Sequence, residues 1–97
     1  MSDAELRALL MDCLSLWGVQ GRVEAVEDGV AISTAGGSFM VQRAGPELRP
    51  VRWFLQTPER AEAGRPARAI PSIPALLTAL RNALGAEQGN KLRIGAA

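Results

Sequence analysis

The sequence predicts an α+β protein. We expect a two-layer sandwich of the order α-β-β-β-β-α, in which two helices pack on one face of an antiparallel four-stranded meander. Two observations predict this fold. Apolar residues recur at helical spacing near each end of the chain, and short β-rich runs separated by turn residues lie between them. Each apolar helix stripe needs a face to cover, and one face of the meander supplies it. The 97 residues (1–97) are expected to form a single domain, since a chain of this length has no room for two.

The clearest predicted helix covers residues 3–17. Its apolar stripe consists of Leu6, Leu9, Leu10, Cys13, Leu14 and Trp17. Ser2, with Glu5 three residues later, forms a capping box that satisfies amide donors at the start of the helix. Met11 and Leu16 lie off the main stripe, so we expect the flank of this helix to contact something as well.

Residues 22–57 are predicted to form the meander. The Asp28-Gly29 pair between two β-rich runs is a strong hairpin signal, because glycine accepts the positive φ that such a turn requires. Gly36-Gly37 indicates a second turn. Alternation along the last two strands places five residues on the face that the helices cover: Phe39, Val41, Val51, Trp53 and Leu55.

The remaining segments are predicted from breakers and caps. Residues 58–71 are rich in proline and arginine, which interrupts any periodicity, and are expected to form a loop. Residues 72–85 are predicted to be the second helix, capped by Ser72 and ended by Gly85. Residues 86–97 are expected to be a mobile tail.

The residues that usually carry chemistry are scarce. The sequence has no histidine, which removes the commonest general base and most zinc ligand sets. Its one cysteine, Cys13, lies within the apolar stripe of the first helix, so we expect an inert buried thiol rather than a nucleophile. We therefore expect no catalytic residue, no metal site, no cofactor and no enzymatic activity.

The composition indicates a cytoplasmic chain. No apolar run approaches the roughly 18 residues that a membrane span requires, so no membrane partner is expected. Residues 1–5 are acidic and polar, unlike the basic and apolar start of a signal peptide. A single cysteine cannot form an intramolecular disulfide, so nothing in the sequence demands an oxidising compartment.

The outer face of the predicted sheet carries the main hypothesis about function. Alternation places Met40 and Phe54 on the face away from the helices, together with Arg52 and Gln56. A free sheet face ordinarily alternates to polar residues, and these two residues do not. One interpretation is that the loop of residues 58–71 covers them. The other is a small protein-interaction domain that self-associates through this face, with a homodimer as the first partner to test.

Arginine carries the alternative hypothesis. Net charge is +1, but residues 1–42 carry −4 and residues 43–97 carry +5, and ten of the eleven cations are arginine. The arginines of the fourth strand and the following loop are Arg52, Arg60, Arg65 and Arg68. Arginines beside an aromatic residue on an open sheet can bind single-stranded nucleic acid or another anion, or an acidic protein partner. The near-neutral total charge and the four aromatic residues favour self-association over nucleic-acid binding.

The predicted order of elements is similar to that of the double-stranded RNA-binding domain. That family carries a lysine cluster at the start of its second helix. The matching segment here reads Ile70-Pro71-Ser72-Ile73-Pro74-Ala75 and contains no lysine. The similarity is therefore one of topology, and we do not infer double-stranded RNA binding from it.

Overall fold

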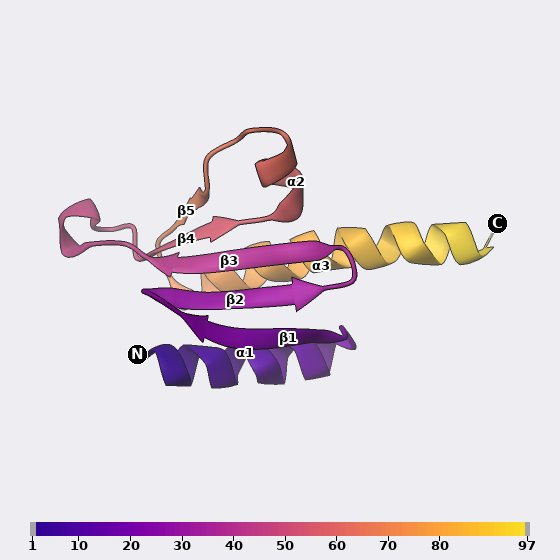
Figure 1. The fold of residues 1–97 in the computed structure, drawn as a ribbon, viewed down its shortest axis with the longest axis horizontal. Coiled ribbons are helices and arrows are strands. Elements are labelled where there is room, and N and C mark those ends of the chain that lie inside the picture. The colour runs from indigo at the N-terminus through magenta and orange to yellow at the C-terminus, as the bar shows by residue number, and fades with distance from the viewer. Residues whose placement is uncertain (1, 97) are drawn as a thin grey trace.

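The computed structural model describes the backbone of residues 2–96 and the side chains of residues 2–85. Its elements in chain order are α1 (Asp3–Trp17), β1 (Gly21–Val26), β2 (Gly29–Thr34), β3 (Gly37–Arg43), the 3-10 helix η1 (Pro46–Leu48), β4 (Trp53–Gln56), α2 (Pro58–Glu62), β5 (Arg68–Ile70) and α3 (Ile73–Ala96). The strands form one antiparallel sheet in the order β1-β2-β3-β4-β5. Figure 1 shows α1 lying along β1 and α3 passing behind the sheet. The predicted α+β two-layer arrangement, with helices packed against an antiparallel sheet, is confirmed.

The sheet has one strand more than the four that were predicted. The additional strand, β5, pairs with β4 through Trp53 and Ile70, Phe54 and Ala69, and Leu55 and Arg68. Three residues are too few for an alternating pattern to be visible in the sequence. Pro66 and Pro71 flank the strand and suggest a loop, although proline next to an edge strand breaks no ladder hydrogen bond.

The rest of the predicted loop and the last helix also differ from expectation. Within residues 58–71 the chain forms α2, which Thr57 caps by accepting a hydrogen bond from the amide of Arg60 (3.2 Å). The prediction that the last helix ends at Gly85 is wrong, because α3 continues to Ala96. Glycine commonly ends a helix by adopting a left-handed conformation, and Gly85 does not have a positive φ. The predicted tail of residues 86–97 is therefore helical as far as Ala96, and Ala97 lies outside the described residues.

The core lies between the two long helices and the inner face of the sheet. Its buried residues are Leu6, Leu10 and Leu14 of α1, Leu76, Ala79, Leu80 and Leu84 of α3, and Val23, Val30, Ile32, Phe39, Val41, Trp53, Leu55 and Ile70 of the strands. Four of the five residues predicted for the inner face are in this set. The fifth, Val51, is half-buried and precedes β4. Because both helix stripes bury against one face, the opposite face of the sheet has neither long helix on it.

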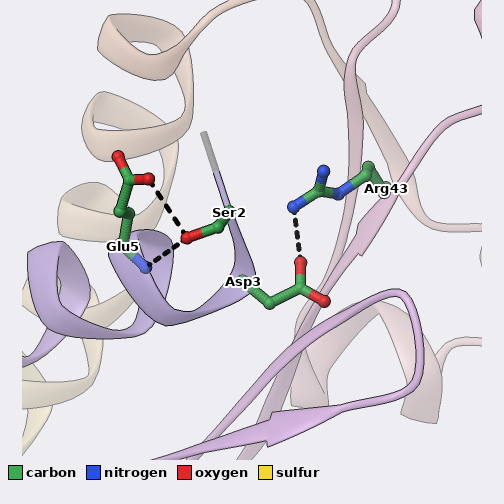
Figure 2. A network of polar contacts seen from close by, with 4 residues as sticks. All are labelled: Ser2, Asp3, Glu5 and Arg43. Atoms are coloured by element: carbon green, nitrogen blue, oxygen red, sulfur yellow. Dashed lines mark hydrogen bonds and ion pairs between the residues drawn. The ribbon is translucent and has the colours of Figure 1, made fainter.

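Polar contacts fix the start of α1 against the sheet. Ser2 Oγ accepts a hydrogen bond from the amide of Glu5 (3.1 Å) and donates to Glu5 Oε1 (3.2 Å), as the capping box predicts. Figure 2 shows Asp3, one residue further along, facing Arg43 at the end of β3, with which it forms an ion pair. One helical turn later, Arg7 Nε donates to the carbonyl oxygen of Val23 in β1 (2.9 Å). Helix α1 is thus held to both β3 and β1.

Candidate interaction surface

The outer face of the sheet contains Met40 and Phe54, as alternation predicted. Met40 lies opposite Gln56, and Phe54 lies between Gln42 of β3 and Ala69 of β5. Met40 and Phe54 are therefore diagonal neighbours on adjacent strands, within reach of each other for side chains of this length. Both are half-buried within a single chain, as is Gln56.

The segment that contains α2 covers one end of this face. Gln56 Nε2 donates to the carbonyl oxygen of Arg65 (3.1 Å), and Gln56 Oε1 is shielded from solvent. Arg60 Nε donates to the carbonyl oxygen of Pro66 (3.0 Å). On the other side of the segment, Pro58 lies so close to Gly37 that an added Cβ there would be 2.8 Å from its Cγ. The Gln56 bond thus ties the segment to β4, whereas the Arg60 bond joins two parts of the segment itself.

The four arginines singled out in the sequence do not share one surface. Arg52 precedes β4, outside its paired residues, and lines a hollow with Trp53 and Ile73 at the end of the sheet. Arg68 pairs with Leu55 and therefore lies on the helix side of the sheet edge. Arg52, Arg65 and Arg68 are exposed, whereas Arg60 is half-buried and bonded within its own segment.

A second group of arginines lies around a hollow at one end of the sheet. The hollow has a volume of about 480 Å³, and Arg43, Arg49 and Arg52 line it beside Trp53 and Ile73. Arg43 is also the partner of Asp3. The sequence hypothesis included only Arg52 of these three, because the other two lie in β3 and in the connection that follows it.

Cys13 has the buried environment expected of an inert thiol. Its side chain is buried, as are those of Leu6, Leu10 and Leu14 of α1. Burial raises the pKa of the thiol, and the nearby Asp12 carboxylate raises it further. Among the residues that the structure describes, no three histidine, cysteine or carboxylate side chains come together as metal ligands would.

Among the side chains that the structure describes, the most exposed large apolar ones lie away from Met40 and Phe54. Leu16 is 84% exposed, Met11 46% and Leu48 44%. Met11 and Leu16 are the two residues of α1 that fall off its apolar stripe, which is the signal in the sequence that pointed to them. Met11 lines a groove of about 560 Å³ between α1 and β1.

Comparison of the chain with models of known protein families, with curated proteins and with solved structures finds no match. No helix among the described residues is long and apolar enough to cross a membrane.

Proposed function

We propose that this chain is a small non-enzymatic interaction domain that self-associates through the outer face of its sheet. The single observation that carries the proposal is the position of Met40 and Phe54. Both keep part of their apolar surface in solvent on the face that neither α1 nor α3 covers. Burying such surface against an identical patch removes it from water in both copies at once, and two-fold contacts of this kind are the commonest in soluble assemblies.

The α2 segment limits this contact to the part of the face that it leaves open. It covers the sheet around Gln56 and Gly37, so the accessible patch centres on Phe54 and extends to Gln42 on the neighbouring strand. A small apolar centre with polar residues around it fits a weak, reversible contact better than an obligate one.

Light scattering coupled to size-exclusion chromatography tests the proposal. We expect the wild type to have at least twice its chain mass of 10.3 kDa, and Phe54→Asp to halve the observed mass. Thr78→Asp is the matched control, since it adds the same charge to an exposed position on α3, on the opposite side of the sheet, and it is expected to leave the mass unchanged. A folded Phe54→Asp variant with the wild-type mass would contradict the proposal.

A second candidate function, anion binding, has one specific observation in its favour. Arg43, Arg49 and Arg52 line the same hollow at the end of the sheet, and arginine recognises carboxylate and phosphate through paired hydrogen bonds. Against binding of long single strands, Arg68 lies on the helix side of the sheet, away from Phe54, and Arg60 is bonded to Pro66. Fluorescence anisotropy of a labelled single strand at low salt, with Arg49→Gln as the variant, tests this function. If the wild type does not bind the labelled strand, nucleic-acid binding is ruled out.

A further inference from the structure

The hollow at the end of the sheet brings together arginines from three segments of the chain. Arg43 is the last residue of β3, Arg49 follows η1, and Arg52 directly precedes β4. All three are exposed, and Trp53 and Ile73 form part of the apolar lining of the hollow. Positive charge is therefore gathered around one cavity of about 480 Å³.

Backbone hydrogen bonds fix the positions from which two of these arginines project. The amide of Arg52 donates to the carbonyl oxygen of Ile70 (2.9 Å), and the Arg52 carbonyl oxygen accepts from the amide of Ala44 (2.8 Å). The amide of Arg49 donates to the carbonyl oxygen of Pro46 (3.3 Å) across η1. A site with a fixed backbone has less conformational freedom to lose when a ligand binds.

Two carboxylates of the chain lie near this positive charge. Figure 2 shows Asp3 facing the guanidinium group of Arg43, with which it forms the ion pair described above. The carboxylate of Glu47 lies close to Gly45, which also lines the hollow. Among the described residues, neither Arg49 nor Arg52 forms an ion pair. Two guanidinium groups are thus open to an outside anion, and the third is shared with Asp3.

The number of arginines around the hollow favours a phosphoryl group over a carboxylate as the ligand. A carboxylate has two oxygens, and the fork of a single guanidinium group satisfies both of them. A phosphate monoester has three acceptor oxygens, which can accept hydrogen bonds from arginines that approach from different directions. The volume of the hollow, about 480 Å³, is also within the range of pockets that hold small molecules.

We infer that this hollow binds the phosphoryl group of a small phosphate monoester through Arg49, Arg52 and Arg43. Arg43 reaches the ligand in competition with Asp3, so the chain carries its own competitor for the site. The inference rests on the anion binding given above as the second candidate function and names its ligand class. It does not depend on self-association, because Phe54 does not line the hollow.

Nuclear magnetic resonance of the ¹⁵N-labelled protein, titrated with methyl phosphate at low salt, tests the site. At about pH 7 this monoester carries nearly two negative charges. We expect the amide signals of residues 43–53 to shift and saturate. Arg49→Gln and Arg52→Gln are each expected to raise the Kd at least about fivefold, because each removes charged donors. Arg81→Gln is the matched control, since it removes the same charge from α3 beside another hollow, and its Kd is expected to equal that of the wild type.

Removing the opposing carboxylates tests the competition for the arginines. Asp3→Asn and Glu47→Gln are each expected to lower the Kd for methyl phosphate about two- to fivefold, as suits partly exposed charges. Asp12→Asn is the control, because it removes the same charge from an exposed position roughly 13 Å further along α1 and is expected to leave the Kd unchanged. An Asp3→Asn variant that binds no more tightly than Asp12→Asn overturns the competition between Asp3 and the ligand.

Three other results overturn the inference. The first is a wild type whose signals do not shift with methyl phosphate, and the second is an Arg49→Gln variant that binds as tightly as Arg81→Gln. The third is acetate binding as tightly as methyl phosphate, since we expect acetate to bind at least about tenfold more weakly.

The outcome is distinguishable from that of the two proposed functions. A wild type that binds methyl phosphate but not the labelled single strand supports this inference and excludes nucleic-acid binding. Light scattering reports self-association separately, so a chain of 10.3 kDa that binds methyl phosphate supports the site and contradicts self-association. A dimer that does not bind methyl phosphate overturns the site and leaves self-association standing.

Discussion

Gly29 packs directly against the carbonyl group of Val41 on the neighbouring strand, so that a Cβ built on Gly29 would overlap the Val41 oxygen. Gly29 is the first residue of β2 and lies opposite Val26 and Gln42 on its two sides. In the same corner, the amide of Arg43 donates to the carbonyl oxygen of Asp28 (2.7 Å). The hairpin between β1 and β2 is thus pressed onto β3, and only a residue without a side chain fits at position 29.

We predict that Gly29→Ala destabilises the protein by about 1–3 kcal/mol, because the backbone of β3 must move away to admit the methyl group. Urea unfolding followed by circular dichroism measures the change. Gly85→Ala is the matched control, since an added Cβ there meets nothing within 4 Å and the residue lies inside α3. It is expected to stabilise the helix by about 0.5–1 kcal/mol. Equal stability of Gly29→Ala and wild type would contradict the packing described above.

This corner also shows what the sequence could and could not predict. The Asp28-Gly29 pair correctly indicated a hairpin, but the two turn residues are Glu27 and Asp28, and it is Asp28 that has the positive φ, of 58°. Position 29 requires glycine because its backbone lies so close to β3, and not because of the turn. Local pattern detects that a turn exists, whereas the reason for this glycine is a contact with a strand that is remote in the sequence.

The same difference between local pattern and remote contacts accounts for what the sequence predicted about the outer face of the sheet. Alternation placed Met40 and Phe54 on one side of the sheet correctly, because it depends only on the period of a strand. The α2 segment, which Gln56 holds against the sheet through its bond to Arg65, has no periodicity in the sequence, so alternation could not place it.

We predict that Cys13 makes the stability of the protein depend on alkaline pH. Burial holds the pKa of its thiol above the ordinary value, and the Asp12 carboxylate adds to this. A raised pKa means that the unfolded chain loses its proton first, so the stability that the neutral thiol contributes is fully present below the ordinary pKa. It is lost as pH rises through that value toward the raised pKa.

Urea unfolding at pH 7 and at about pH 10 measures this dependence in wild type and in Cys13→Ala. The variant lowers stability at both pH values by leaving a small cavity, so the quantity compared is the change between the two pH values. We expect the wild type to lose more stability than Cys13→Ala over this range. A thiol that reacts with Ellman's reagent as quickly in the folded protein as in urea would contradict the buried environment of Cys13.

The Asp3–Arg43 ion pair is predicted to contribute little to stability despite its position between α1 and β3. The side chains of Asp3 and Arg43 are 38% and 44% exposed, so water and salt screen their attraction.

Because Arg43 makes a further interaction, and Asp3 also lies in the first turn of α1, neither single variant isolates the pair. A double-mutant cycle with Asp3→Asn and Arg43→Gln removes these separate effects. We expect a coupling free energy below about 1 kcal/mol that decreases between low salt and about 1 M salt. A coupling that is large and unchanged by salt would show that the pair is shielded from solvent, contrary to its exposure here.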